Sequence, residues 1–373
     1  MRRTTTAILL TALFLTLLPA GAAEGRRLPI RFFGIVPQTA LDSTDIAYMR
    51  AGRIGRLRTP VDWSLVELSP GKYDWYGLDG SVGLAAREGI EVLPYFYGTP
   101  PWFAPRPTQL PVANDAQRTA WAAFLQAAVA RYGPGGAFWA EHGPGTKEPL
   151  PSVPIHWWQI WNEPNFFYFA TPASPKLYGR LLKASARAIR SVDPSAKILL
   201  AGLFGRPKAR PPRAMPAATF LQRLYRFRGI KRFFDGIALH PYAANLTALR
   251  RNLWQVRRVA LKNRDRRTGL YVTELGWGSQ HNPRKVAFEV GKRGQARELR
   301  EAYSYLIERR NKLNLKGLYW FSWRDAVPEP EAPVCNFCDS AGLFEAGEAM
   351  RAKPAWHAFV RISRGRPRPL RSR

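Results

Sequence analysis

Residues 155–164 read Ile-His-Trp-Trp-Gln-Ile-Trp-Asn-Glu-Pro. The run is mostly apolar and does not alternate strictly between polar and apolar residues. That pattern is typical of a parallel strand that is covered on both faces. The stretch therefore predicts a buried parallel strand over residues 155–161, with a carboxylate, Glu163, just beyond its end.

Similar strand-type runs alternate with helical patterns along the rest of the chain. The predicted strands are 30–36, 54–58, 91–97, 155–161, 198–203, 234–240, 270–274 and 318–323. The predicted helices are 42–51, 78–89, 115–131, 175–192, 217–227, 246–263, 293–311 and 355–362. Eight strand–helix units within about 340 residues favour a single-domain (β/α)8 barrel of the α/β class. An open doubly wound sheet would usually carry a Gly-rich loop after its first strand, where this chain has Val-Pro-Gln at 36–38.

The two ends of the chain differ in composition from this pattern. Residues 1–23 combine Arg2 and Arg3 with a short apolar run and small residues, which predicts a signal peptide and a secreted or cell-envelope protein. An uncleaved membrane anchor is the alternative, but stable membrane insertion is not expected. We expect the barrel over 28–363 and a disordered basic tail over 364–373.

The chain carries a formal net charge of +30, and removal of the signal peptide, with its two arginines, leaves +28. A strongly basic surface attracts polyanions. For an exported protein an acidic glycan is a more natural partner than nucleic acid, which we do not expect. The alternative is that the arginines only lie on a solvated surface and bind no polyanion.

Cys335 and Cys338 form a Cys-x-x-Cys pair. Such a pair can belong to a zinc site, a redox centre or a disulfide. No further Cys or His lies at the short spacing that a zinc site needs. In the oxidising compartment expected for an exported protein, a structural disulfide is the favoured interpretation. The scattered histidines and the lack of nucleotide-binding motifs predict neither a metal nor a cofactor.

Two glutamates close predicted strands, at the end of a (β/α)8 barrel where active sites lie. Glu163 lies just after the fourth predicted strand, and Glu274 is the last residue of the seventh. Burial and a neighbouring carboxylate raise the pKa of one acid of such a pair, which suits it to proton donation at neutral pH. The pair therefore predicts acid/base chemistry, although either glutamate could instead pair with an arginine.

The segments around these glutamates resemble clan A glycoside hydrolases. Residues 161–164, Trp-Asn-Glu-Pro, resemble the strand-four signature of the clan, and residues 273–277, Thr-Glu-Leu-Gly-Trp, resemble its strand-seven nucleophile segment. The resemblance implies that Glu163 is the acid/base and Glu274 the nucleophile. It also implies that Asn162 binds a sugar 2-hydroxyl group.

The resemblance extends over the whole mature chain and implies further substrate-binding residues. Arg58 matches the strand-two arginine that contacts the nucleophile. His240 and Tyr242 match strand six, and Trp323 matches the strand-eight tryptophan that floors the sugar. Other aromatic residues in loops after the strands are candidates for sugar stacking, namely Trp102, Phe166, Phe167, Tyr168 and Trp277.

The resemblance implies a retaining enzyme, whose two carboxyl groups lie roughly 5–5.5 Å apart. The pattern is similar both to the family of β-xylosidases and α-L-iduronidases and to the cellulase-like family. The expected partner is a carbohydrate, either neutral or acidic, and we expect a monomer. The alternatives are a barrel that binds envelope polysaccharide without cleaving it, and polyanion binding through the Arg-rich tail.

Overall fold

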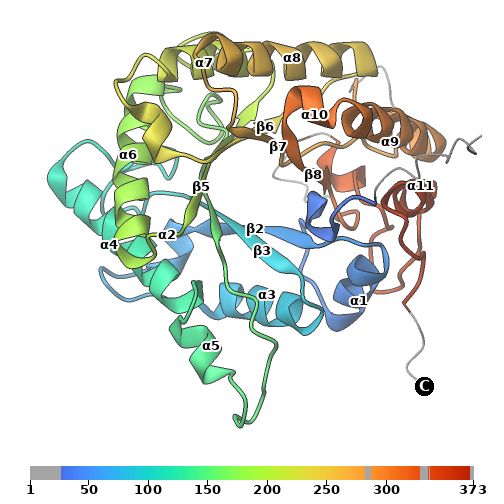
Figure 1. Ribbon diagram of the computed structural model, residues 1–373, viewed down its shortest axis with the longest axis horizontal. Coiled ribbons are helices and arrows are strands. Elements are labelled where there is room, and N and C mark those ends of the chain that lie inside the picture. The colour runs from blue at the N-terminus through green and yellow to red at the C-terminus, as the bar shows by residue number, and fades with distance from the viewer. Residues whose placement is uncertain (1–26, 282–286, 328–334, 336, 370–373) are drawn as a thin grey trace, which may run out of the picture.

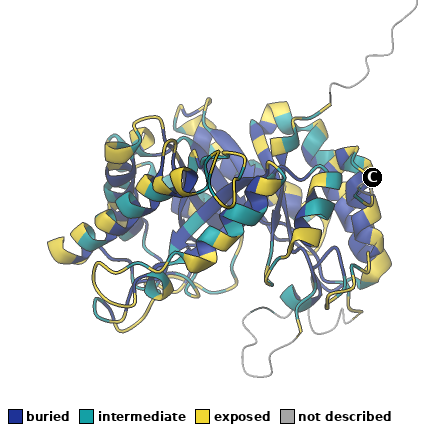
Figure 2. Ribbon diagram, turned by 90° about the horizontal axis from the view of Figure 1, so that it is seen from below, coloured by how far each residue is buried: buried dark blue, intermediate teal, exposed yellow. Residues whose placement is uncertain are grey.

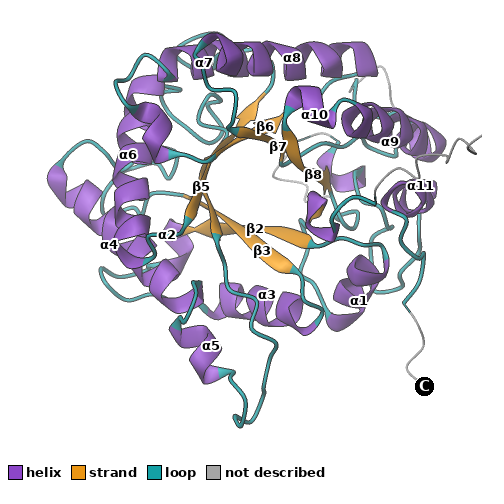
Figure 3. Ribbon diagram, in the orientation of Figure 1, coloured by secondary structure: helices purple, strands orange, loops and turns teal. Residues whose placement is uncertain are grey.

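The computed structural model describes residues 27–281, 287–327, 335 and 337–369. Eight parallel strands form a closed barrel in the order of the sequence, and helices surround it (Figures 1 and 3). The fold is therefore a (β/α)8 barrel, as predicted. The strands are β1 Phe33–Val36, β2 Arg56–Asp62, β3 Glu91–Tyr97, β4 Trp157–Asn162, β5 Lys197–Phe204, β6 Gly236–His240, β7 Gly269–Val272 and β8 Leu315–Phe321.

Helices connect successive strands on the outside of the barrel. The α-helices are α1 Ser43–Ala51, α2 Trp63–Val66, α3 Tyr76–Arg87, α4 Asp115–Tyr132, α5 Ala137–Glu141, α6 Pro175–Val192, α7 Ala217–Leu224, α8 Leu246–Lys262, α9 Gly291–Glu308, α10 Arg310–Leu313 and α11 Pro354–Ser363. Three short 3-10 helices are η1 Ile30–Phe32, η2 Ile230–Phe233 and η3 Cys338–Ser340. Among the helices in the described ranges, none is at once long and apolar enough to cross a bilayer.

Local sequence signals explain where several of these helices begin. The Asp42 side chain accepts a hydrogen bond from the backbone of Asp45, and Asp45 returns one, which is a capping box for α1. Asn114 and Asn245 cap α4 and α8 through their side-chain oxygens. Ser174 caps α6, and a proline occupies the first helical position.

The strands lie in the core, and the outward faces of the helices are exposed (Figure 2). Every residue of β1, β6 and β7 is buried. This pattern is expected for strands that have side chains filling the barrel on one face and helices on the other. The mostly apolar strands seen in the sequence are thus explained.

Most predicted elements are present, with shifted ends. The second strand extends to Asp62 instead of ending at Arg58, and the eighth ends at Phe321 instead of continuing to Trp323. The stretch before β4 contains a helix, α5, that the sequence pattern did not indicate. The predicted signal peptide lies outside the described residues.

The expectation of a disordered tail over 364–373 is wrong for its described part, residues 364–369. The backbone N–H of Arg366 donates to the carbonyl of Ala51, and the Trp356 indole N–H donates to the carbonyl of Pro367. These hydrogen bonds hold the segment on the barrel because they satisfy backbone groups that would otherwise need water.

Candidate active site

Glu163 and Glu274 lie side by side at the carboxyl-terminal end of the barrel. Glu163 directly follows β4, and Glu274 lies two residues beyond β7. Only 5% and 8% of their surfaces are exposed. One carboxylate oxygen of each, together with a ring nitrogen of His240, lie within 4.8 Å of one another. The barrel therefore brings together two acids that are 111 positions apart in the sequence.

The backbone on either side of Asn162 adopts an uncommon conformation. Trp161 has φ 67° and Glu163 has φ 39°, in the left-handed region that non-glycine residues rarely occupy. Two hydrogen bonds hold this turn: the Trp161 indole donates to the carbonyl of Phe169, and the Glu163 N–H donates to the carbonyl of Gly202. Strained backbone of this kind clusters at functional sites, where it fixes the direction of a side chain.

Arg58 lies beneath the two glutamates and is fully buried. Its Nη1 donates to Oε1 of Glu274 over 2.6 Å, and its Nη2 donates to Oδ1 of Asn162 over 2.8 Å. Its Nε donates to Gln159, and its guanidinium stacks 3.8 Å from the centre of the Tyr95 ring. These contacts leave Arg58 one orientation, and it neutralises the charge of Glu274 when that carboxyl is ionised.

His240 and Tyr242, from the end of β6, contact the glutamates from the opposite side. His240 Nδ1 lies 2.7 Å from Oε1 of Glu163, and its Nε2 lies 3.1 Å from the hydroxyl of Thr273. The Tyr242 hydroxyl donates to Oε2 of Glu274 over 2.9 Å. A glycine, Gly202, leaves space for the imidazole, which a Cβ at that position would strike.

The electrostatics distinguish the two acids. Burial, and next the charge of Glu274, raise the pKa of Glu163 well above its ordinary value. Burial also raises the pKa of Glu274, but Arg58 and the Tyr242 hydroxyl act in the opposite direction. Burial, reinforced by the charge of Arg58, lowers the pKa of His240 well below its usual range. The site therefore favours an ionised Glu274, a protonated Glu163 and a neutral His240.

The same three residues are the one group, within the described ranges, whose geometry would allow a metal ion. Two observations argue against that use. Arg58 places a positive charge 2.6 Å from Glu274, and His240 Nδ1 is already within hydrogen-bond distance of Glu163. A cation bound there would lie next to the guanidinium, so we interpret the group as a hydrogen-bonded acid pair.

A cavity of about 630 Å³ opens above the glutamates. Its wall is mostly aromatic and also contains the disulfide. The described lining residues are Val36, Pro37, Gln38, Pro60, Tyr95, Tyr97, Asn162, Glu163, Phe166, Tyr168, Phe169, Phe204, Tyr242, Glu274, Phe288, Phe321, Cys335, Phe337 and Cys338. Flat aromatic rings around two acids suit a ligand with apolar faces and hydroxyl groups, such as a sugar.

The structure does not bring Trp323 to this cavity, and the expectation that Trp323 floors a sugar is corrected. Its side chain is fully buried, and its indole N–H donates to Asp45 of α1. Strand β8 ends at Phe321, so the chain has already turned away from the barrel axis at position 323. Phe321, two residues earlier, lines the cavity instead.

Of the other aromatic residues proposed to stack on sugars, some line the cavity and others do not. Phe166 and Tyr168 line the cavity, as expected. Trp277 is fully buried against Trp320, and Trp102 and Phe167 are not among the lining residues. Several lining rings were not singled out from the sequence, namely Tyr95, Tyr97, Phe169, Phe204, Phe288, Phe321 and Phe337. The ends of β3 and β8 could have indicated Tyr97 and Phe321, because both residues close a strand.

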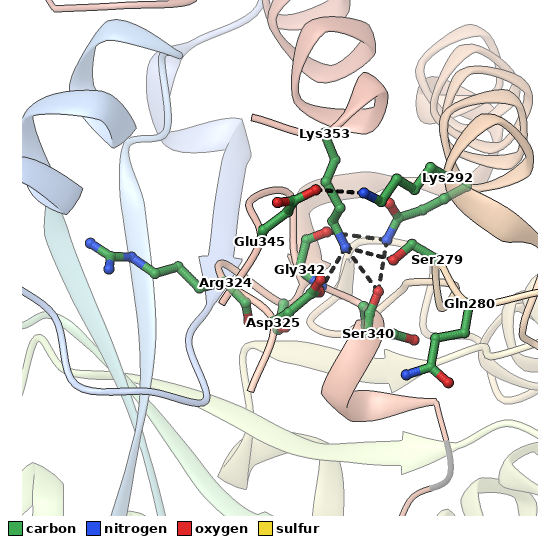
Figure 4. Close-up of polar contacts among 12 residues, drawn as sticks. Ser279, Gln280, Lys292, Arg324, Asp325, Ser340, Gly342, Glu345 and Lys353 are labelled. Carbon is green, nitrogen blue, oxygen red and sulfur yellow. Dashed lines mark hydrogen bonds and ion pairs between the residues drawn. The ribbon is translucent and has the colours of Figure 1, made fainter. Parts of the chain in front are cut away.

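The predicted disulfide between Cys335 and Cys338 is present and forms part of the cavity wall. A polar network behind this wall joins the loops after β7 and β8 to the start of α11 (Figure 4). The buried amino group of Lys353 donates to Asp325 over 2.6 Å, to Ser279 and to the carbonyl of Ser340. Nearer the surface, Lys292 pairs with Glu345. The network fixes the loops that carry this side of the cavity.

No family model matches the sequence, and no curated protein matches it. Solved structures do match. A family 39 glycoside hydrolase from Bacteroides cellulosilyticus WH2 has a TM-score of 0.62, with 23% identity over 90% of this chain and 63% of its own. This chain has the same fold as that glycoside hydrolase.

Two further matches cover most of the chain at lower identity. A monomeric β-xylosidase from Caulobacter crescentus CB15 has a TM-score of 0.61 and 19% identity, over 88% of this chain and 67% of its own. Xylanase 10B from Thermotoga maritima has a TM-score of 0.60 and 14% identity, over 90% of this chain and 96% of its own. The sequence resemblance to clan A glycoside hydrolases is thus accompanied by a similarity of fold to solved structures of glycoside hydrolases. This chain spans only about two-thirds of the length of the first two proteins.

Proposed function

We propose that this protein is a retaining glycoside hydrolase, with Glu163 as acid/base and Glu274 as nucleophile. One observation carries the proposal: two buried carboxylates, with oxygens within 4.8 Å, occupy the floor of an aromatic cavity. This separation suits attack by one carboxylate on the sugar, since direct displacement by water needs carboxyl groups roughly 6.5–9.5 Å apart.

The contacts in the site support an order of events. Glu274 attacks the anomeric carbon while the protonated Glu163 transfers its proton to the departing glycosidic oxygen, so that the leaving group departs as a neutral alcohol. The ionised Glu163 then removes a proton from water, and the resulting attack on the glycosyl ester releases the sugar and restores Glu274. Arg58 and the Tyr242 hydroxyl stabilise the Glu274 carboxylate before and after this cycle.

Asn162 and His240 support these steps. The Asn162 side chain is held by Arg58 and lines the cavity beside Glu163, where its amide can bind a sugar hydroxyl. His240, which is neutral, keeps the Glu163 carboxyl in one orientation through Nδ1. Its other nitrogen is held by Thr273, so the imidazole cannot turn freely.

The described lining of the cavity contains no lysine or arginine. A carboxylate or sulfate on the sugar would therefore find no cation among these lining side chains. Aryl glycosides of neutral sugars are the first substrates to test, and a neutral poly- or oligosaccharide is the substrate we propose. We further propose export through residues 1–23 and action as a monomer.

Covalent labelling tests the nucleophile. A 2-fluoro aryl glycoside slows release of the glycosyl-enzyme, and we expect mass spectrometry of peptide digests to place the sugar on Glu274. The variant Glu274→Gln should neither be labelled nor turn over substrate. Glu298→Gln is the matched control, because Glu298 is a buried acid on α9 away from the cavity. A label on any other residue would overturn the assignment.

The acid/base has its own test. Glu163→Gln should lose activity on glycosides with poor leaving groups and keep far more on dinitrophenyl glycosides, which need no protonation to depart. Equal losses on both kinds of substrate would contradict the role of Glu163. Glycan binding by the parent protein without turnover of any glycoside would instead favour the non-catalytic barrel.

A further inference from the structure

The end of the barrel opposite the cavity carries a large excess of exposed cations. These residues lie on the connections that lead into β5, β6, β7, β8 and β1, and on the last described segment of the chain. We call this surface the basic face. Its exposed cations are Arg27, Arg31, Lys197, Arg226, Arg228, Lys231, Arg232, Arg264, Arg266, Arg267, Lys312, Lys316, Arg364, Arg366 and Arg368.

Hydrogen bonds between neighbouring connections show that the basic face is continuous. The Lys231 amino group donates to the carbonyl of Asn263, which joins the connection before β6 to that before β7. The Asn314 amide donates to the carbonyls of Arg267 and Thr268, which joins the connections before β7 and β8. The cations therefore form one band across half of this end of the barrel.

The band is densest where the two ends of the described chain meet. Arg27, Arg53, Arg310 and Arg364 line one small cavity, and Arg27 donates to the carbonyl of Arg364. Backbone carbonyls hold the Arg53 guanidinium, and no described carboxylate pairs with any of the four. Burial, and then the charges of Arg27 and Arg364, lower the pKa of Arg53. An anion would relieve this repulsion.

The carboxylates on the same connections are mostly engaged by other groups. Asp235 pairs with Arg190 and, more distantly, with Lys197 of the basic face, and Glu308 pairs with Arg309. Arg31 of the basic face pairs with Glu91 at the start of β3. Asp265 is buried and accepts a hydrogen bond from Tyr225. Asp193 and Asp265 are the acids of these described connections that form no ion pair. The described ion pairs therefore leave most cations of the basic face without a carboxylate partner.

The opposite end of the barrel has a different balance. The described loops after the strands carry about as many acids as cations, so the positive charge is concentrated away from the cavity. The acids there are Asp42, Asp62, Glu67, Asp74, Glu163, Glu274, Glu289, Asp325, Asp339, Glu345 and Glu348. The cations are Lys72, Arg106, Arg206, Lys208, Arg210, Arg213, Arg324, Arg351 and Lys353.

We propose that the basic face docks on a membrane surface that contains anionic phospholipids. Charge complementarity supplies the attraction, since each Lys or Arg near such a surface favours binding. A membrane is favoured over a soluble polyanion because the exposed cations spread over five connections, an area that a plane of headgroups can contact at once.

Docking in this orientation turns the cavity away from the bilayer, because the cavity lies at the carboxyl-terminal ends of the strands. The site then faces substrates in the surrounding compartment. The interaction is separate from the proposed glycosidase activity, and its test measures binding without turnover.

Vesicle sedimentation with the full chain tests the proposal. The probes are vesicles of phosphatidylcholine, with and without phosphatidylglycerol, at several salt concentrations. The test variant combines Arg228→Gln, Arg266→Gln and Arg267→Gln, whose side chains are exposed and make no described hydrogen bond. The matched control combines Arg206→Gln, Lys208→Gln and Arg210→Gln, which remove the same charge from the loop after β5.

We expect phosphatidylglycerol to strengthen binding of the parent protein, and salt to weaken it. At about 1 kcal/mol for each cation, loss of three should weaken the phosphatidylglycerol-dependent binding roughly 100-fold, against little change in the control. Equal losses in both variants would overturn the proposal, because net charge and not the basic face would then govern binding. Binding that ignores phosphatidylglycerol, while a soluble acidic polysaccharide binds through the same three arginines, would also overturn it and assign the face to that polymer.

Discussion

Replacement of Arg58 by methionine should shift the pH dependence of the proposed glycosidase activity. Arg58 lowers the pKa of Glu274, so its removal raises that pKa, and the proposed nucleophile is then protonated at higher pH. The acidic limb of kcat/KM must therefore move toward alkaline pH. Methionine is chosen because it is unbranched and fills much of the space of the arginine side chain.

The size of the shift follows from the geometry. Nη1 of Arg58 lies 2.6 Å from Oε1 of Glu274, a separation at which two unit charges interact by about 6 kcal/mol at an effective dielectric constant near 20. That figure is an upper limit, because water and the Tyr242 hydroxyl partly replace the lost cation. The interaction of an adjacent arginine with a carboxylate is usually worth about 1.4–4 kcal/mol. Its loss should therefore move the acidic limb toward alkaline pH and lower kcat/KM most at acidic pH.

The assay is the pH profile of kcat/KM on an aryl glycoside, for the parent, Arg58→Met and Arg58→Lys. Lysine keeps the charge and should restore part of the acidic limb. Arg56→Met is the matched control: Arg56 lies on the same strand and pairs with the buried Glu91 over 3.2 Å, but at the opposite end of the barrel. A folded Arg58→Met enzyme with an unmoved acidic limb would refute the reasoning.

Two further predictions test single contacts. Tyr242→Phe removes a hydrogen bond to the Glu274 carboxylate. Such a bond is worth about 1.5–3 kcal/mol, so kcat/KM should fall about 10- to 100-fold. Tyr225→Phe is the control: it loses a similar hydrogen bond to Asp265, far from the cavity, and should leave kcat/KM unchanged. Lys353→Met breaks a buried ion pair and should lower the free energy of unfolding by about 3–5 kcal/mol in chemical denaturation. Lys292→Met breaks an exposed pair nearby and should cost less than about 1 kcal/mol, so equal losses would contradict the argument from burial.

The sequence was sufficient for the architecture and for the proximity of Glu163 and Glu274. Periodicity identifies strands and helices, and the rule that sites lie at the ends of parallel strands selects Glu163 and Glu274. It was less reliable where an argument depended on the last residue of a strand. The apolar run predicts that strand eight continues to Trp323, but β8 ends two residues earlier, and the Trp323 side chain contacts Asp45.

Features that depend on separate loops meeting in space were not predictable from local patterns. The aromatic wall of the cavity combines residues from several loops, and only closure of the barrel brings Phe204 and Phe288 near Phe337. The basic charge was visible in the composition, but its concentration at one end was not. Composition alone predicts a disordered tail, whereas Arg366 and Pro367 form hydrogen bonds with the barrel.

The hydrogen bond from Arg27 to Arg364 joins the beginning and the end of the described chain, at the pole of the barrel farthest from the two glutamates. A tag, a solid support or a fused domain attached at either end would therefore leave substrate access unobstructed. The same proximity makes the chain suited to circular permutation, with a short linker across that pole and new ends in a connection remote from Glu163 and Glu274.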